Sequence, residues 1–428
     1  MEPDQPLGGA PTKVASSQLP ILALFSANSI SMVGNVCAGI AIPWFVLQTT
    51  GSAADTGITG FFTILPVVLA GFFGGALVDR IGYKPTSIVA DLASGITVAL
   101  IPLLHFTVGL QFWQLMVLVF LGGLLDAPGS TARGALVPDL AALAGWPLER
   151  ATSASQVVER SSRLVGAPLA GVLIAVIGTA NVLWIDAASF FVSAALVAVA
   201  IRAPRPKPQE AAPTRYFDEM RNGLKFLGGR RLIQVMVMVV MVTNFVDAAF
   251  AGVLMPVYAK RVWGTAVNLG LIIAVTGGGS VLGAILFGAL GRRVSRYATF
   301  VGMFVVASSL YWSLALFLPF PIILIAALIT GIAAGPLNPI IDAVLYERVP
   351  PDMRGRVFGT ITAGAWLTMP LAMLVSGFLT EQFGLLPILV ACGLIYLITT
   401  VSAIFIPAMR ELDERPNLQP QSTPTEAD

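Results

Sequence analysis

The first and second halves of the chain match each other at a constant interval of 213 positions. Glycines, prolines and charged residues recur at the same place in each half: Gly39 and Gly252, Pro43 and Pro256, Gly57 and Gly270, Arg80 and Arg293, Pro138-Asp139 and Pro351-Asp352. The register holds across this distance without a gap. Two hydrophobic halves in the same order and orientation are the construction of one large class of secondary transporters. The repeat therefore indicates a mechanism, but it does not indicate a substrate.

The composition places both halves in a membrane. Of the 428 residues, 56% are hydrophobic and 11% are charged, whereas a soluble protein of this size carries about 25% charged residues. Twelve apolar segments have the length of about 20 residues that a membrane span needs. We predict spans near 19–48, 56–78, 86–107, 112–135, 154–178, 181–201, 230–260, 266–290, 297–318, 320–345, 356–380 and 384–407. The sequence thus predicts an all-α membrane protein with 12 transmembrane helices in two pseudo-symmetric six-helix bundles.

The positions of the basic residues set the orientation. Of the 25 Lys and Arg residues, only Lys260 and Arg261 fall on one side of the predicted loops. The positive-inside rule then places both termini in the cytoplasm. The expected divisions are a disordered cytoplasmic tail at 1–18, an N-terminal six-helix bundle at 19–201, a cytoplasmic linker with an amphipathic helix at 202–229, a C-terminal six-helix bundle at 230–407 and a cytoplasmic tail at 408–428.

A charged loop after the second span carries the clearest motif. It reads Gly75-Ala76-Leu77-Val78-Asp79-Arg80-Ile81-Gly82-Tyr83-Lys84. It resembles the signature loop of the major facilitator superfamily, in which a glycine, an Asp-Arg pair, a glycine and a basic residue link spans 2 and 3. An ordinary loop that obeys the positive-inside rule would explain Arg80 and Lys84. It would not explain Asp79 between two glycines, which suits a helix N-terminus or an arginine.

The equivalent loop of the second half has the opposite charge, because Arg292 stands where the first half has Asp79. Our hypothesis is that Asp79 faces the basic start of span 11 while Arg292 faces Glu159 at the start of span 5. Such cross-half pairs would latch the cytoplasmic side and favour the outward-open state. Direct contact with substrate is the alternative for the span 5 charges. The candidate gating residues are Gly75, Asp79, Arg80, Gly82, Lys84, Arg133, Glu159, Arg160, Arg163, Arg292, Arg354 and Arg356.

Four further segments resemble the third drug:proton antiporter family, which includes macrolide exporters and the Tap-type pumps of actinobacteria. They are residues 124–133, 159–168, 351–357 and 406–413. Residues 166–171 are a loose form of the antiporter motif that lacks the usual adjacent glycines. The resemblance implies a transporter rather than an enzyme, without a cofactor. It further implies export of amphiphilic compounds across a bacterial plasma membrane, coupled to proton influx.

Polar residues fall on spans 1, 4, 7 and 10, which surround the central cavity in the major facilitator fold. A charge near the bilayer centre costs about 2.5–3.5 kcal/mol, so each such residue needs a reason. The proton-coupling candidates, in order, are Asp247, which has no basic neighbour in its span, Asp126 and Asp342. Carboxylates that only pack between helices remain the alternative for each. Asp91 and Asp186 lie nearer the ends of spans 3 and 6 and are expected at the membrane interface.

The remaining candidate residues describe a cavity for a lipophilic substrate. Flexible and aromatic side chains with few charges suit lipophilic weak bases or neutral drugs. The expected cavity residues are Asn28, Asn35, Asn244, Phe245, Phe250, Asn338 and Trp366. Two cysteines and one histidine supply no metal-site spacing, and a net charge of +2 gives no reason to expect a nucleic-acid partner. We expect a monomer in the lipid bilayer.

Two other functions remain open. The chain could be a dedicated exporter of an endogenous metabolite or siderophore, because the same resemblance admits it. It could also be a lipid-translocating or non-transporting protein of the same fold. A siderophore with negative charge would favour a cavity with spare positive charge, whereas the central spans offer acids and amides.

Overall fold

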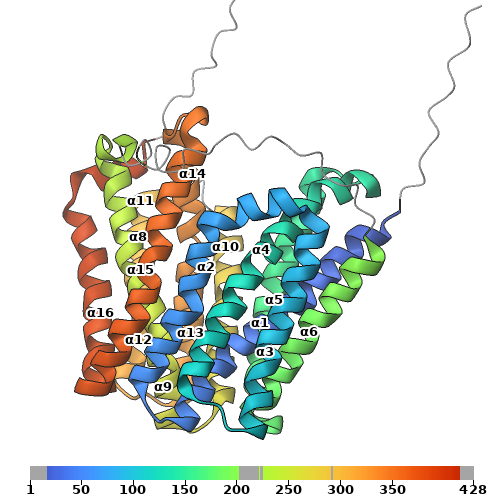
Figure 1. The fold of residues 1–428 in the computed structure, drawn as a ribbon. Helices are drawn as coiled ribbons and strands as arrows, with labels where there is room; N and C mark the ends of the chain where they lie inside the picture. The colour runs from blue at the N-terminus through green and yellow to red at the C-terminus, as the bar shows by residue number, and fades with distance from the viewer. Residues whose placement is uncertain (1–16, 202–220, 222–224, 291–292, 415–428) are drawn as a thin grey trace, which may run out of the picture.

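The computed structural model describes residues 17–201, 221, 225–290 and 293–414, without the side chains of 71–77, 79–80 and 352. In this part of the chain, 12 helical segments are long and apolar enough to cross a membrane. They form two groups that lie side by side (Figure 1). The all-α fold with two six-helix bundles is therefore confirmed. Of the predicted tails, residues 17–18 and 408–414 are described, while the rest of both tails and most of the predicted linker helix lie outside the described residues.

The first half consists of six nearly uninterrupted helices. They are α1 (Leu19–Thr49), α2 (Ala53–Ile81), α3 (Tyr83–Thr107), α4 (Phe112–Ala144), α5 (Leu148–Ile177) and α6 (Thr179–Ala200). Gly82 has a φ of 93°, which glycine adopts without strain, and it ends α2 and begins α3 in a single residue. This is the tight turn that the charged loop predicts.

The second half repeats this order with more breaks. Its segments are α8 (Arg231–Ala249), η1 (Phe250–Leu254), α9 (Met255–Tyr258), η2 (Ala259–Trp263), α10 (Ala266–Leu290), α11 (Arg296–Ala307), α12 (Ser309–Ala315), α13 (Phe320–Ala334), α14 (Leu337–Arg348), η3 (Pro351–Met353), α15 (Arg354–Phe383), α16 (Leu385–Ser402), η4 (Ala403–Phe405) and η5 (Pro407–Leu412). Two π-helical turns, η1 and η2, flank Pro256 in the seventh span. Proline has no N–H to donate, so the regular hydrogen-bond ladder is interrupted there.

The fourth and fifth helices extend well beyond the predicted spans. The prediction ended span 4 at 135 and began span 5 at 154, whereas α4 runs to Ala144 and α5 begins at Leu148. Apolar side chains hold this extension: Leu136 and Leu140 are buried in one cluster with Ile21 of α1. Hydropathy marks the apolar stretch of a helix but not its end, which explains the difference.

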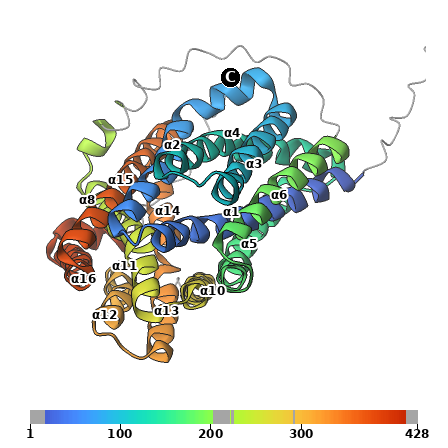
Figure 2. The ribbon, with the colours of Figure 1, turned by 60° about the horizontal axis from the view of Figure 1, so that its bottom comes forward.

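The two halves touch mainly through two helix pairs, α2 with α15 and α5 with α10, as Figure 2 shows. A Cβ on Gly57 of α2 would lie 2.5 Å from the backbone oxygen of Met373 and 2.8 Å from Cα of Gly377. A Cβ on Gly270 of α10 would lie 2.5 Å from the backbone oxygen of Ala167. Only glycine permits such close approach of two helices.

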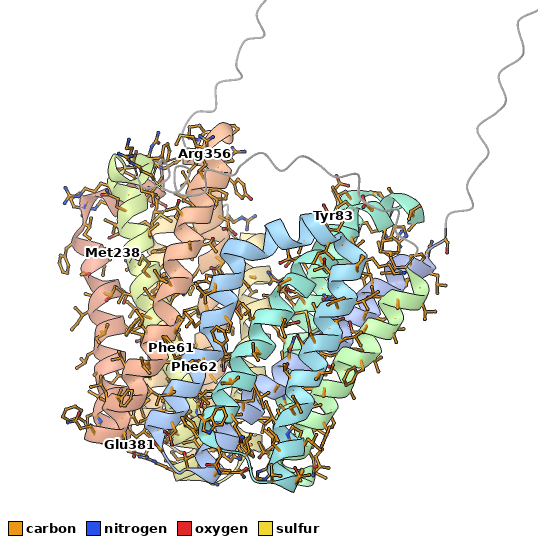
Figure 3. The ribbon with its side chains drawn as sticks, viewed as in Figure 1. Phe61, Phe62, Tyr83, Met238, Arg356 and Glu381 are labelled. Carbon is orange, nitrogen blue, oxygen red and sulfur yellow. The ribbon has the colours of Figure 1, made fainter. Side chains whose placement is uncertain are left out.

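These contacts lie toward one end of the molecule. We call it the Gly264 end, because Gly264 and the turns at Gly51, Gly178 and Gly384 lie there; the other, where α1 begins, is the Leu19 end. The two groups of helices come together at the Gly264 end and diverge toward the Leu19 end (Figure 1). On α15, Arg356 marks the Leu19 end and Glu381 the Gly264 end (Figure 3).

Candidate functional site

Two cavities adjoin along α4 inside the molecule. One of about 600 Å³ lies between α1, α4 and α5, and its wall includes Asn28, Asn35 and Asp126. The other, of about 540 Å³, lies between α2, α4 and α15, and its wall includes Trp366. Ser130 belongs to both walls. Asn28 and Asn35, which the sequence analysis expects in a cavity, both lie in the wall of the larger one.

The lining of the larger cavity runs along α1 from Gly39 to Leu24, that is, toward the Leu19 end. The helix contacts between the halves lie at the opposite end. The structure therefore combines a packed Gly264 end with a cavity that extends toward the Leu19 end.

Arg133 of α4 organises the polar side of the larger cavity. Its guanidinium is 3% exposed and forms a salt bridge with the fully buried carboxylate of Asp91 in α3. Its Nε donates to Oδ1 of Asn28 at 3.3 Å, and a terminal nitrogen lies 3.7 Å from Oδ1 of Asp126. A buried guanidinium needs such partners on several sides, because an unpaired charge in the interior costs several kcal/mol.

The sequence analysis expected Asp91 at the membrane interface, but the structure buries it completely between α3, α4 and α6. The carboxylate accepts hydrogen bonds from Arg133 and, at 2.7 Å, from Ser193 of α6. Position along a span could not reveal that α4 and α6 bring a guanidinium and a hydroxyl to the same point. The available signal was Arg133 itself, because a basic residue within an apolar segment requires an acidic partner.

Asp126 occupies the cavity wall, with 24% of its side chain exposed. Its Oδ2 accepts a hydrogen bond from Asn35 at 3.2 Å. The sequence suggested Arg133 or Arg163 as an ion-pair partner, and the structure places Arg133 beside it. Arg163 instead pairs with Glu159 of its own helix at 3.2 Å.

Asp247 has a different environment in the second half. It is exposed, and its Oδ1 accepts a 2.6 Å hydrogen bond from the hydroxyl of Tyr311 in α12. The ring of Phe250 lies 4.5 Å from that of Tyr311, measured between centroids. Phe245 packs against the small cluster of Ala248, Ala249 and Ala372. Sequence reasoning selected Asp247 but gave no sign of its tyrosine partner.

The other predicted cavity residues of the second half are dispersed. Asn338 and Asp342 are exposed on one face of α14, and Asn244 is partly buried on α8. Trp366 is 43% exposed in the wall of the smaller cavity. The structure thus brings the first-half candidates together and leaves those of the second half apart.

Some of the predicted gating residues lie outside the described part of the chain. The side chains of Asp79 and Arg80 and all of Arg292 lie outside the described residues, so the latch between the halves stays a prediction. Lys84 donates to the backbone oxygen of Ala198 at 2.9 Å. Arg354 donates to the backbone oxygens of Tyr346 and Val349 within its own half. Arg160 and Arg356 are exposed, and Gly75 lies within α2.

Asp186 is the second carboxylate that the prediction misplaced. It was expected at the interface, but it is 1% exposed and faces Gly34 of α1 from the middle of α6. Counting residues from the span end placed it too near the surface. A carboxylate eight positions into a span of 22 residues is already deep in the helix.

Comparisons with known proteins agree with this architecture. The sequence model of the Major Facilitator Superfamily matches residues 24–261 and 237–426. Multidrug efflux pump Tap of Mycobacterium tuberculosis is 31% identical over 405 residues, which cover 94% of this chain and 96% of that protein. Macrolide efflux protein A of Streptococcus pyogenes is 22% identical, covering 92% of this chain and 98% of its own.

Solved structures show the same fold at low identity. The nucleoside transporter NupG matches with a TM-score of 0.73 at 12% identity, covering 90% of this chain and 98% of its own. A D-xylose-proton symporter matches with a TM-score of 0.68 at 17% identity, covering 92% and 99%. The resemblance carried by the charged loop and the duplicated halves is thereby confirmed. This chain, a multi-pass integral membrane protein, belongs to the major facilitator superfamily.

Proposed function

We propose that this chain exports amphiphilic drugs across a bacterial plasma membrane by alternating access, in exchange for protons. The observation that carries the proposal is the pair of cavities that share Ser130 in their walls, of which the first has several charged and amide groups and the second is mainly apolar. Asp126 and Asn35 offer an acid and an amide on one side, and Phe358 and Trp366 offer aromatic surface on the other. A lipophilic weak base fits this combination, with its cation near the acid and its body against the rings.

The names of the relatives support the same class of substrate. Tap is a multidrug efflux pump, and macrolide efflux protein A is named for macrolides. The alignment with Tap covers 96% of that pump, so no large part of it lacks a counterpart in this chain.

The proposal includes the orientation of the protein in the membrane. The positive-inside rule puts the Leu19 end in the cytoplasm, together with both termini. The described conformation is then inward-open, with its cavity facing the cytoplasm and the extracellular end held by the glycine contacts. Rocking of the two halves around the cavity would give the outward-open state.

An anionic siderophore is a weaker candidate for the substrate. The cavity has an arginine, Arg133, but its guanidinium is taken by Asp91, Asn28 and Asp126. Arg163 at the cavity wall is paired with Glu159. Little unpaired positive charge is thus left among the described wall residues to attract an anion.

Transport into proteoliposomes tests the proposal. With purified protein and an imposed pH gradient, we expect lipophilic cationic drugs to accumulate against their gradient and protons to move in the opposite direction. Asp126→Asn should abolish accumulation, whereas Asp55→Asn at the distant start of α2 should not. Accumulation that is independent of the pH gradient would rule out proton exchange, and a failure to move any drug in a broad panel would rule out drug export.

A further inference from the structure

The carboxyl group of Asp186 is sealed between α6 and α1. The residue is 1% exposed, and neither carboxyl oxygen has a hydrogen-bond partner among the described residues. It occupies the space beside Gly34, where a Cβ would lie 2.5 Å from Oδ1 of Asp186. A buried polar group without a partner requires an explanation.

The two donors near the carboxyl group of Asp186, Ser189 and Cys37, both donate to backbone oxygens instead. The hydroxyl of Ser189, which borders the same space, donates to the backbone oxygen of Asp186 at 2.7 Å. The thiol of Cys37 in α1 donates to the backbone oxygen of Gly166 at 3.5 Å. While the Ser189 hydroxyl is turned to the backbone, an ionised carboxylate at Asp186 receives no hydrogen bond from the described residues, whereas a protonated carboxyl needs only an acceptor. The hydroxyl oxygen of Ser189 keeps lone pairs that can accept such a hydrogen bond.

The charged groups around Asp186 also favour a protonated carboxyl group. On α3, Asp91 is already paired with Arg133 and Ser193. On α5, the pair of Glu159 and Arg163 is largely exposed. Asp126 in α4 reaches the same part of α1, because it accepts a hydrogen bond from Asn35, the residue that follows Gly34.

Asp126 and Asp186 differ in what surrounds them. Asp126 has an amide donor and a guanidinium nearby and lines the cavity, while Asp186 has neither. Two neighbouring carboxyl groups are not both ionised at low cost, so one proton is held between them.

The first and sixth spans of the second half also have a carboxyl group between them. It is carried by the first of the two spans, α8, whereas in the first half it is carried by the sixth, α6. The interval of 213 positions that relates the halves puts Asp247 at the place of Gly34. Gly178 and Gly384 begin α6 and α16 with nearly the same φ of 82° and 88°. Counted from these glycines, Asp186 corresponds to Cys392 of α16, the helix that packs against α8, which carries Asp247.

Each half thus places one carboxyl where its first and sixth spans meet. Asp247 is exposed and has Tyr311 as a donor, whereas Asp186 is enclosed and has none. A carboxyl at the same contact in both halves argues against an accident of packing, because each such group is costly in a membrane.

We propose that Asp186 is a proton-binding residue of the transporter and exchanges its proton with Asp126 in the cavity wall. This rests on the proposed function. The proton leaves an Oδ of Asp186, is accepted by the carboxylate of Asp126 and passes to water in the cavity. Arg133 tolerates the temporary loss of charge on Asp126, because its contact with that residue is 3.7 Å long while Asp91 and Asn28 still hold it.

The infrared spectrum of the purified full-length protein tests the bound proton directly. We expect the wild type near neutral pH to show the carbonyl stretch of a protonated carboxyl, and Asp186→Asn to lose that band. Asp55→Asn, which changes a carboxyl in the first turn of α2, serves as the control and should keep it. If Asp186→Asn does not fold, Asp186→Cys introduces the residue of the second half. A wild-type spectrum identical to that of both folded Asp186 variants would overturn the proposal.

Proton release on drug binding tests the exchange. In detergent, Asp186→Asn should bind drug with wild-type affinity but release fewer protons per bound drug, and it should lose drug accumulation driven by a pH gradient. A defect in packing alone would lower binding as well. Unchanged proton release in Asp186→Asn would overturn the proposal. If the wild type binds no drug and yet shows the infrared band that Asp186→Asn removes, the bound proton stands and the proposed drug export fails.

Discussion

The carboxylate of Glu381, in the last turn of α15, accepts a 2.7 Å hydrogen bond from the backbone N–H of Ala53, in the first turn of α2. The bond joins the two halves at the Gly264 end, where Figure 3 shows Glu381. The first N–H groups of a helix have no partner within it, and a negative charge there is favourable. Glu381 therefore acts as a cap that one half supplies to the other.

Replacing Glu381 should weaken the packed Gly264 end. We expect Glu381→Ala to shift the conformational equilibrium toward opening of this end by about 1 kcal/mol, or roughly fivefold, because one charge-assisted hydrogen bond is lost at a partly exposed site. Labelling of a cysteine introduced at this end would measure the shift. Glu381→Gln keeps an acceptor oxygen and should lie between the two. Labelling of Glu381→Ala at the wild-type rate would show that the bond does not hold the halves together.

Gly270 should tolerate no side chain. We expect Gly270→Ala to prevent the close contact between α10 and α5, because the added Cβ would lie 2.5 Å from the backbone oxygen of Ala167. Drug export should fall at least tenfold while the protein still folds within its two halves. Gly288→Ala in the same helix is the control, since nothing lies within 4 Å of its Cβ position. Equal export by the two variants would contradict the argument.

The buried pair of Arg133 and Asp91 should dominate the stability of the first half. Asp91→Asn leaves the guanidinium short of negative charge in the interior, so we expect a loss of about 3–5 kcal/mol. A thermal melt in detergent measures it as a lower transition temperature. Asp126→Asn should cost clearly less, because its contact with Arg133 is the longer one at 3.7 Å. Similar transition temperatures for the two variants would refute this ranking.

Asp247 and Tyr311 should matter for coupling rather than for drug binding. We expect Asp247→Asn to bind drug and lose drug accumulation driven by a pH gradient. Tyr311→Phe keeps the carboxyl but removes its 2.6 Å donor, so it should retain only part of the accumulation. Accumulation assays paired with equilibrium drug binding would show this split. Loss of binding together with accumulation would instead indicate a structural role.

Residues 407–414, which include η5, are held to the start of α11 by hydrogen bonds of Asp413. This attachment should depend on pH. The partial burial of Asp413 raises the pKa of the carboxyl, but hydrogen bonds from Ser295 and the backbone N–H of Tyr297 outweigh this, and the pKa falls below the usual 3.8. The stabilisation is complete above the unfolded pKa and is lost as the pH falls through the lower folded value. Protease protection of the segment should therefore be greater in the wild type than in Asp413→Asn at neutral pH, and should become equal in strong acid. A difference that persists in strong acid would exclude this cause.

The sequence predicted the fold well, because the length of the apolar segments and the repeat can be read without knowing which helices meet. The spacing of Asn28 and Asn35 identified a cavity face, since residues seven apart share one side of a helix. It also offered Arg133 and Arg163 as partners for Asp126, and the structure places Arg133 beside that carboxylate. The partners of Asp91 and the enclosure of Asp186 depend on which helices meet, and one sequence does not reveal that. The tyrosine beside Asp247 escaped prediction for the same reason.

The helix ends were predicted less well. Residues 136–144 continue α4, although the apolar stretch used to define the span had already ended. Packing against the start of α1 supports those turns, and hydropathy does not detect packing between helices.

The network around Arg133 has a consequence for the transport cycle. Arg133, Asp91, Asn28, Asp126 and Ser193 all belong to the first half, so a rigid rotation of one half against the other leaves every bond among them intact. These bonds consequently add nothing to the free-energy difference between the two conformations. The balance between the inward and outward states therefore depends on the surfaces between the halves, where α2 meets α15 and α5 meets α10. At the glycines of these surfaces, an added methyl group would be enough to change it.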